Sequence, residues 1–286
     1  MAKIGVIGGS GFYRMEGMNL GRALEVSTPF GKPSAPLQEA EAEGVELVFL
    51  ARHGIGHRYN PSCVPYQANI YALKSVGVTH IISVGAVGTL RKDIEPLHFV
   101  VPDQIIDRTR SRPNTFFDPI AVHVGFADPF CPCLRKVLVA QIRKQGLTVH
   151  DGGTYVCMEG PLFSTKAESA LHRSWGASII GMTVLPEAKL AREAEICYAT
   201  IALATDYDVW HDETVTVEVV VGRIQKNVSN VQEVLRGVFP RIADLAGKEC
   251  ECRSALKNAI LSDPAAIPDE RKAAFRLLLG KYVDLD

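Results

Sequence analysis

Short runs of apolar residues alternate with longer segments of mixed polarity along this 286-residue chain. Several of the runs consist almost entirely of Val, Ile, Leu and Ala, which is typical of strands buried on both faces of a sheet. We predict strands over residues 4–7, 46–51, 80–84, 99–101, 153–158, 178–182 and 197–205. The pattern therefore indicates a chain built around a buried sheet.

Segments with helical patterns lie between these strands. The predicted helices cover residues 66–76, 133–145, 164–175, 186–195, 217–246, 252–261 and 270–282. Strands that alternate with helices predict an α/β fold, with a mostly parallel or mixed twisted central sheet flanked by helices. We expect a single domain at residues 1–248, followed by a C-terminal helical extension at residues 249–286.

The composition is that of an ordinary globular protein, and it excludes several classes of partner. Apolar residues make up 47% of the chain, charged residues make up 22%, and the net charge is −1, so nothing favours binding to nucleic acid or to a membrane surface. The sequence has no signal-peptide pattern and no apolar run of about 18 residues or more. We expect a cytoplasmic protein whose partners are small molecules.

The chain has seven cysteines, and four of them form the C-x-C pairs Cys131–Cys133 and Cys250–Cys252. The odd number and the absence of a secretion signal favour reduced thiols. C-x-C differs from the C-x-x-C spacing of zinc sites, and no histidine cluster accompanies either pair. Neighbouring buried thiols are the simpler interpretation, and a redox or disulfide role for Cys250 and Cys252 is the alternative. We expect no metal and no cofactor.

A glycine-rich turn with one hydroxyl, Gly8-Gly9-Ser10-Gly11, follows the first predicted strand. Such a turn presents backbone N–H groups and a serine to an anion. The turn also has the first half of the dinucleotide fingerprint G-x-G-x-x-G, but Arg14 stands where the third glycine should be. A dinucleotide-binding oxidoreductase is therefore a remote alternative. The other alternative is an ordinary strand-to-helix turn of an α/β protein that binds no ligand.

Polar motifs recur where other predicted strands end. They are Arg52-His53-Gly54, Gly85-Ala86-Val87-Gly88, Met182-Thr183 and Thr205-Asp206-Tyr207-Asp208. In open α/β sheets ligands bind beyond the carboxyl ends of the strands, so we expect one composite pocket. The hydroxyl of Ser10, the planar guanidinium of Arg52 and nearby backbone amides are donors that suit an oxyanion.

Asp206 and Asp208 are two residues apart, so both carboxylates point to one face if the strand continues through them. Two like charges in one site raise the pKa of one carboxyl group, which can then act as an acid. Such a pair suits protonation of a leaving-group nitrogen and hydrogen bonding to an exocyclic amine. A pair of ordinary turn carboxylates is the alternative. Phe163 precedes a predicted helix N-cap at Ser164 or Thr165 and can stack on a flat ligand.

Together these residues resemble the purine nucleoside phosphorylases of the trimeric type, from residue 4 to about residue 221. The motifs that carry the resemblance are Gly8-Gly9-Ser10-Gly11, Thr28-Pro29-Phe30-Gly31-Lys32-Pro33, Ala51-Arg52-His53-Gly54, Tyr66-Gln67-Ala68-Asn69, Glu159-Gly160-Pro161, Met182-Thr183 with Pro186-Glu187, and Ala204-Thr205-Asp206-Tyr207-Asp208. The resemblance implies a nucleoside phosphorylase-like fold. It also implies cleavage of a purine nucleoside by inorganic phosphate, which is a co-substrate and not a cofactor.

The resemblance also implies roles for individual residues. Phosphate binding is implied for Ser10, Arg52, His53, Thr183 and the amides of Gly85 and Ala86. Nucleoside binding is implied for Phe163, Met182, Thr205, Asp206, Asp208, Val217 and Val220, and for His123 from a neighbouring subunit. Asp206 and Asp208 are the expected catalytic residues, and the His123 contact implies a homo-oligomer, a trimer or a dimer of trimers.

The residues near the base and the 5' position favour one substrate. Relatives that take 6-oxopurines have Asn where this chain has Asp206, and Glu where it has Ser164. A carboxylate accepts a hydrogen bond from a 6-amino group and repels a 6-carbonyl. Apolar Val217 and Val220 favour a methylthio group over a 5'-hydroxyl. The expected reaction is phosphate-dependent cleavage of 5'-methylthioadenosine to adenine and 5-methylthioribose 1-phosphate, as in purine and methionine salvage.

Three positions depart from the family pattern and leave alternatives open. Gly85 stands where relatives often have a Ser or Thr hydroxyl, Leu162 replaces a common Arg, and Gly181 replaces a common Asn. The changes at Leu162 and Gly181 leave room for a looser base pocket. A phosphorylase of 6-oxopurine nucleosides or methylthioinosine is therefore the alternative enzyme. A catalytically silent purine-binding protein is the alternative of a different class.

Overall fold

The computed structural model describes residues 2–9, 18–211, 216–245 and 247–285, and within them the strands form one mixed eleven-stranded sheet. The strands are β1 (Lys3–Gly8), β2 (Asn19–Leu24), β3 (Leu37–Ala42), β4 (Val45–Ala51), β5 (His80–Thr89), β6 (Phe99–Val101), β7 (Gln104–Arg108), β8 (Val149–Asp151), β9 (Thr154–Met158), β10 (Ile179–Gly181) and β11 (Cys197–Asp206). The helices are α1 (Tyr66–Ser75), α2 (Pro132–Lys144), α3 (Lys166–Ser174), α4 (Glu187–Glu193), α5 (Val217–Ala243) and α6 (Asp269–Leu279). Among the described residues, no helix is both long enough and apolar enough to cross a bilayer.

The long strand β5 is the centre of the sheet. It pairs in parallel with β1 and with β11, and near its end it pairs antiparallel with β10. The sheet runs in the order β2-β3-β4-β1-β5-β10-β9-β7, while β11 continues to β6 and β8. The expected α/β fold with a mixed sheet is confirmed.

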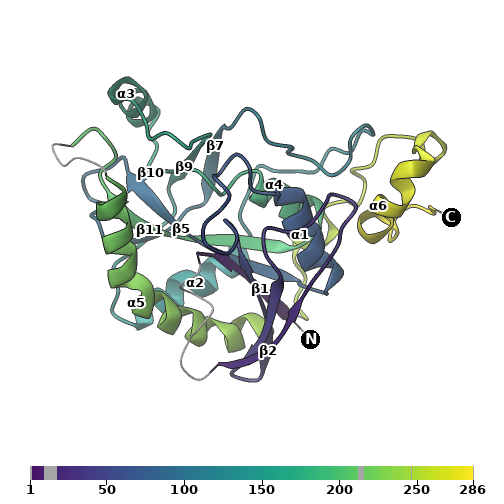
Figure 1. The fold of residues 1–286 in the computed structure, drawn as a ribbon, viewed down its shortest axis with the longest axis horizontal. Helices are drawn as coiled ribbons and strands as arrows, with labels where there is room; N and C mark the ends of the chain where they lie inside the picture. Colours follow the sequence, from purple (N-terminus) through teal and green to yellow (C-terminus); the bar gives the residue numbers. More distant parts are fainter. Residues whose placement is uncertain (1, 10–17, 212–215, 246, 286) are drawn as a thin grey trace.

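Helices cover both faces of this sheet (Figure 1). Helices α1 and α4 pack together on one face, and α2 and α5 pack together on the other. The alternation of side chains along β11 serves both layers: Tyr198 and Ala202 join the first apolar cluster, and Ala199 and Ile201 join the second. The near-continuous apolar sequence of β11 follows from burial on both faces.

The C-terminal segment, yellow in Figure 1, lies at one end of the molecule beside α1 and α4. The rings of Phe117 and Phe275 meet edge to face with centroids 5.7 Å apart. Leu256 and Leu279 are fully buried in the same apolar cluster as α1 and α4. The predicted extension therefore shares its core with the rest of the chain.

Several predicted boundaries are wrong, for identifiable reasons. The expected helix at 252–261 is only a 3₁₀ turn, Glu251–Ser254, because Asn258 is left-handed (φ 66°) and Ile260 pairs with Val122. The motif from Gly85 to Gly88 does not follow a strand end but lies inside β5. Strands β2, β3, β7 and β8 were not predicted, because they lack long runs of β-branched residues. The last residue of the predicted helix 217–246 lies outside the described residues, and α5 ends at Ala243.

The buried carboxyl group of Glu193 should make stability depend on pH. Burial raises its pKa from 4.5 to about 7, against a hydrogen bond from the Phe116 amide. Between these values the folded state holds a proton that the unfolded state has lost, so the free energy of unfolding should fall by up to about 1.4 kcal/mol per pH unit as the pH rises. Glu193→Gln should remove this slope in urea unfolding measured from pH 4.5 to pH 8. Glu46→Gln, on the exposed side of β4, should retain it; equal slopes in both variants would contradict the prediction.

Candidate active site

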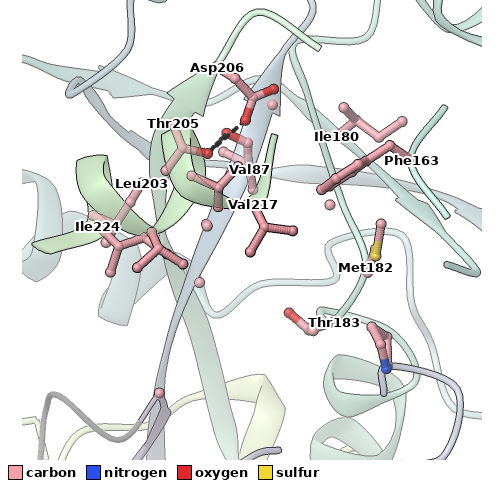
Figure 2. Close-up of a pocket in the computed structure, with 18 of the residues that line it drawn as sticks. Val87, Phe163, Ile180, Met182, Thr183, Leu203, Thr205, Asp206, Val217 and Ile224 are labelled. Carbon is pink, nitrogen blue, oxygen red and sulfur yellow. Dashed lines mark hydrogen bonds between the residues drawn. The ribbon is translucent and has the colours of Figure 1, made fainter. Parts of the chain in front are cut away.

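A cavity of about 340 Å³ is lined by residues of β5, by residues at the ends of β10 and β11, and by the N-terminal half of α5. The predicted residues that line it are Arg52, His53, Gly85, Ala86, Phe163, Met182, Thr183, Thr205, Asp206, Asp208, Val217 and Val220. Figure 2 shows Thr205 and Asp206 at one end of the cavity and Thr183 at the other. The fold thus brings segments that are far apart in sequence into one pocket.

One edge of β5 is open at the Thr183 end. Strand β1 pairs with β5 only as far as Ser83, and β10 pairs only from Gly88, so the residues between them have no strand neighbour on that edge within the part of the chain that the structure describes. The Val84 carbonyl on this edge accepts a hydrogen bond from Arg52. Alternate residues of a strand direct their N–H and C=O groups to the same edge, so the Ala86 N–H points into the opening and the amide of Gly85 faces β11. Of the two predicted amide donors, the geometry favours Ala86.

Arg52 lies beside this opening in a fixed orientation. Its Nε and Nη2 donate to the Glu187 carboxylate at 2.8 and 3.0 Å, Nη2 also donates to Ser83 Oγ, and Nη1 donates to the Val84 carbonyl. Five N–H groups are available on a guanidinium, so these contacts leave one Nη1 donor for a ligand. The positive group is buried, and its hydrogen-bond partners belong to β5 and α4.

His53 is neutral in this environment. Burial, together with the neighbouring Arg52 charge, lowers its pKa to about 4. Its Nδ1 lies 2.9 Å from the Tyr59 carbonyl, which can only accept, so Nδ1 carries the proton and Nε2 is left as an acceptor. The ring also stacks on His57 with centroids 4.2 Å apart. His53 can therefore accept a hydrogen bond from a protonated oxygen of an anion.

The other end of the cavity holds the two aspartates. Asp206 accepts hydrogen bonds from Thr205 Oγ1 and from the Asp208 N–H, both at 2.8 Å. Burial raises the pKa of Asp206, and the Asp208 charge adds to this effect. Asp208 Oδ2 is buried and has no hydrogen-bond partner among the described residues. The carboxyl group of Asp206 is thus suited to hold a proton, and Oδ2 of Asp208 is an acceptor that no described donor contacts.

The backbone between these aspartates differs from the sequence prediction. A β-bulge interrupts the pairing at Thr205, β11 ends at Asp206, and Asp208 has a left-handed backbone (φ 49°). Asp208 therefore reaches the cavity through a turn, and not through strand alternation. Gly88 makes room for the pair, because a Cβ there would lie 2.9 Å from Asp206 Oδ1.

Apolar side chains line the cavity beneath α5. Val217 and Val220 contribute from its first turns, whose N-cap is Thr216. Phe163 lies on the opposite side of the cavity in Figure 2, just before α3. Of the two predicted N-cap residues of α3, Thr165 is the one used, in a capping box with Glu168. This part of the pocket suits an apolar or flat ligand.

Two predicted residues are not placed in the cavity of this chain. Ser10 lies outside the described residues. His123 is exposed on a loop and does not line the cavity, and its backbone N–H bonds the Ala259 carbonyl. A contribution of His123 to a neighbouring subunit's site therefore stays a prediction.

The structure adds two residues to the site that sequence analysis did not identify as such. Glu187 belongs to the Pro186-Glu187 motif, but sequence analysis gave it no role. In the structure its carboxylate fixes Arg52 and accepts a hydrogen bond from the Tyr198 hydroxyl. Arg112 is buried, and its Nη1 donates to the Met182 and Leu185 carbonyls at 2.6 Å, which fixes the loop after β10. No spacing distinguishes Arg112 from the nearby arginines at 108 and 110, so only the fold identifies it.

Comparisons with known proteins all point to one family. Residues 3–240 match the sequence model of the phosphorylase superfamily. The chain is 54% identical to S-methyl-5'-thioadenosine phosphorylase of Geobacter sulfurreducens, with 98% of this chain and 99% of that protein covered. It is 51% identical to the protein of the same name from Thermosynechococcus vestitus, with 99% of each chain covered.

Solved structures agree with this result. A methylthioadenosine phosphorylase from an antarctic soil metagenomic library superimposes with a TM-score of 0.92 at 45% identity, covering 97% of this chain and 99% of that one. The methylthioadenosine phosphorylase of Schistosoma mansoni in complex with adenine has a TM-score of 0.85 at 36% identity, covering 91% and 99% of the two chains.

Proposed function

Because this chain belongs to the phosphorylase superfamily, we propose that it cleaves 5'-methylthioadenosine with inorganic phosphate to give adenine and 5-methylthioribose 1-phosphate. One observation carries the proposal. A single cavity joins an edge with anion donors to a buried aspartate pair, and apolar side chains line the space between them. Phosphate suits the edge with anion donors, a sugar with an apolar 5' group suits the apolar lining, and an aminopurine suits the aspartate pair.

Phosphate is assigned to the open edge of β5. The Arg52 Nη1 donor that no described residue uses and the Ala86 N–H face this place, with the Thr183 hydroxyl beside it. A contribution of Ser10, which lies outside the described residues, stays a prediction. His53 accepts from a protonated phosphate oxygen through Nε2. Phosphate held below C1' of the sugar stabilises the positive charge of an oxocarbenium-like transition state and then bonds to that carbon. The C1'–N9 bond breaks, and its electron pair goes to the purine.

The departing base is assigned to the aspartate pair. Burial raises the pKa of Asp206 and so favours its protonated form, and we assign to it the proton that N7 of the purine receives, so that adenine leaves as a neutral molecule. The unpartnered Oδ2 of Asp208 accepts from the 6-amino group. A 6-carbonyl at the same place would leave a buried acceptor facing another acceptor, which disfavours oxopurines. Phe163 provides a surface on which the purine ring stacks.

The 5' substituent is assigned to Val217 and Val220 on α5. Neither side chain can hydrogen-bond to a 5'-hydroxyl, while both can pack against a methylthio group. His123 of a neighbouring subunit is expected to close this end in a trimer or a dimer of trimers. Activity that rises with protein concentration in step with trimer formation would support that assignment.

The proposal is tested by incubating the protein with 5'-methylthioadenosine, with and without phosphate, and following adenine by chromatography. We expect release only with phosphate, and equimolar formation of the sugar 1-phosphate. A ranking of kcat/KM over 5'-methylthioadenosine, adenosine, inosine and methylthioinosine tests the choice of base. Absence of phosphate-dependent turnover with every one of these nucleosides would contradict the proposal and favour a silent purine-binding protein.

Replacing Gly85 by serine should lower the KM for phosphate about fivefold. A Cβ at this position would lie 3.5 Å from Thr183 Oγ1, an ordinary contact, so a hydroxyl fits beside the phosphate place. One additional hydrogen bond contributes about 1 kcal/mol. Gly85→Ala is the matched control, since it fills the same space without a hydroxyl. Equal phosphate KM values for the two variants would show that the hydroxyl does not reach the ligand.

A further inference from the structure

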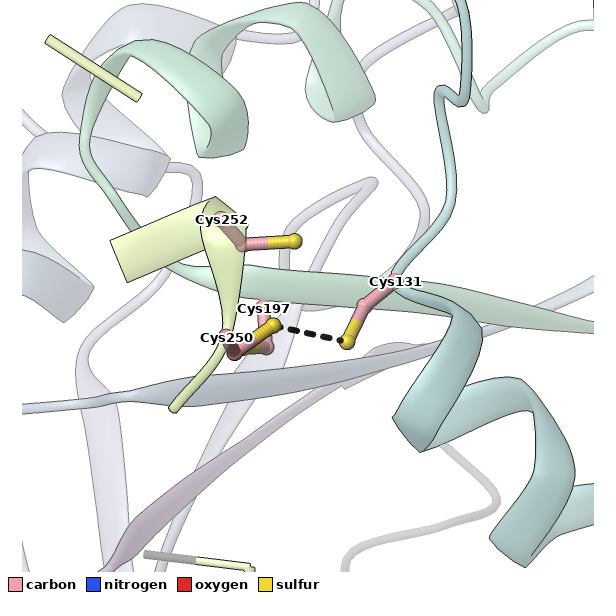
Figure 3. A group of neighbouring side chains, drawn as sticks. All are labelled: Cys131, Cys197, Cys250 and Cys252. Atoms are coloured by element: carbon pink, nitrogen blue, oxygen red, sulfur yellow. Dashed lines mark hydrogen bonds between the residues drawn. The ribbon is translucent and has the colours of Figure 1, made fainter. Parts of the chain in front are cut away.

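Four cysteines from three parts of the chain meet where β11 begins (Figure 3), whereas the cavity lies where β11 ends. Cys131 is the N-cap of α2, Cys197 is the first residue of β11, and Cys250 and Cys252 belong to the C-terminal segment. The four Sγ atoms all lie within 4.8 Å of one another. Sequence analysis treated Cys131 with Cys133, and Cys250 with Cys252, as separate C-x-C pairs and expected no metal, because the separate segments gave no sign of meeting.

The spacing of the sulfurs is that of a tetrahedral metal site. Cys250 Sγ lies 3.6 Å from Cys131 Sγ and 3.6 Å from Cys197 Sγ. Four sulfurs at about 2.3 Å from a central zinc ion lie about 3.8 Å apart in a regular tetrahedron. A disulfide would instead need about 2.05 Å between two of them and would leave the other two without a role. All the cysteines are free thiols in the structure.

The surroundings suit a tetrathiolate. Cys131, Cys197 and Cys252 are buried, and Cys250 is half-buried, so water is largely excluded. The guanidinium of Arg192 is close enough to Cys252 to interact with it electrostatically. It is held in place by hydrogen bonds to the Gly125 and Asp128 carbonyls. A positive charge here offsets the net −2 charge of a divalent ion with four thiolates.

We propose that Cys131, Cys197, Cys250 and Cys252 bind one zinc ion. The thiol protons leave to solvent as the four Zn–S bonds form, and no oxidation or reduction is involved. Four protein ligands complete the tetrahedron and leave no open position, so the ion is structural and not catalytic. It ties the C-terminal segment to the start of α2 and the start of β11.

The proposed ion is remote from the proposed chemistry. Cys197 begins β11 and Asp206 ends it, so the ten-residue strand separates them by about 30 Å. Loss of zinc should therefore lower thermal stability and leave the KM for phosphate and nucleoside unchanged in the protein that remains folded. This outcome separates the proposal from the assignment of the active site.

The test is metal analysis of the full chain, purified without chelator under reducing conditions. We expect one zinc per chain by mass spectrometry of the metal. Replacement of zinc by cobalt(II) should give the visible absorption of a tetrahedral tetrathiolate. Cys131→Ser, Cys197→Ser, Cys250→Ser and Cys252→Ser should each lose the metal and melt at a lower temperature.

Cys133→Ser is the matched control, because Cys133 belongs to a C-x-C pair but is exposed and outside the cluster. It should keep one zinc per chain and the wild-type melting temperature. If a serine variant fails to fold, the cobalt spectrum of the wild-type chain still decides. A wild-type chain that neither contains zinc nor takes it up, or a thiol titration that finds a disulfide among these cysteines, would overturn the proposal.

Discussion

Replacing Asp206 by asparagine should lower kcat/KM for 5'-methylthioadenosine by about 10²- to 10⁴-fold, the contribution that a general acid typically makes. An asparagine amide can donate a hydrogen bond to N7 but cannot transfer a proton to it. The geometry should otherwise persist, because Asn Oδ1 can accept the hydrogen bond that Asp206 Oδ1 accepts from the Asp208 N–H. The loss should therefore lie mainly in kcat.

The pH profile gives a second signature of this role. Because burial raises the pKa of Asp206, its protonated form is lost as the pH rises through that value. The rate of the wild-type enzyme should fall on the alkaline side, and the Asp206→Asn variant should lack that limb. Steady-state kinetics over the pH range measures both profiles. If the Asp206→Asn variant kept the alkaline limb of the wild-type profile, the proton donated to the purine would come from another group.

The same substitution should change the order of substrates. An amide at 206 can donate to the acceptor atoms of a 6-oxopurine, so inosine should lose less activity than 5'-methylthioadenosine. Asp93→Asn is the matched control, since Asp93 is exposed and paired only with Arg91 among the described residues. It should leave rates, pH profile and ranking unchanged.

The sequence was informative where a residue's chemistry and its position agreed. Arg52 and His53 follow the end of β4, and Asp206 ends β11, so the rule that ligands bind beyond strand ends located all three beside the cavity. The glycines of β5 were predicted to follow the end of a strand, but they lie inside it. Gly88 lets the Asp206 side chain approach the strand closely, a requirement that depends on a residue distant in sequence.

The sequence also could not show where one residue fills the space that a distant residue leaves. Gly181 was expected to loosen the pocket by omitting a side chain that relatives have. In the structure a Cβ at 181 would overlap the hydroxyl of Tyr155, so tyrosine fills the space that the glycine leaves. The partnership of Arg52 with Glu187 is similar, since 135 residues separate the two side chains and only the fold brings them together. Periodicity predicts which face is buried, but not which buried charges meet.

Replacing Glu187 by glutamine should lower the free energy of unfolding by about 3–5 kcal/mol, because it leaves the buried charge of Arg52 without its partner. The side chains of Arg52 and Glu187 are only 3% and 1% exposed. Glutamine can accept one of the two guanidinium hydrogen bonds, but its amide group faces Arg52 donors at the other oxygen position. Arg52 should lose its fixed orientation, so the KM for phosphate should rise together with the loss of stability.

A double variant without either charge separates the two effects. The pair Arg52→Met with Glu187→Leu removes both charges and fills the space with apolar atoms, so it should be more stable than Glu187→Gln although it binds phosphate poorly. Asp93→Asn breaks the Arg91–Asp93 pair, whose side chains are 50% and 57% exposed, and should cost at most about 1 kcal/mol. Urea unfolding gives the free energies, and phosphate titration of the initial rate gives KM. If Glu187→Gln unfolds like the wild-type chain and keeps its phosphate KM, then Glu187 does not hold Arg52 for its ligand, and the guanidinium must be oriented by Ser83 and Val84 alone.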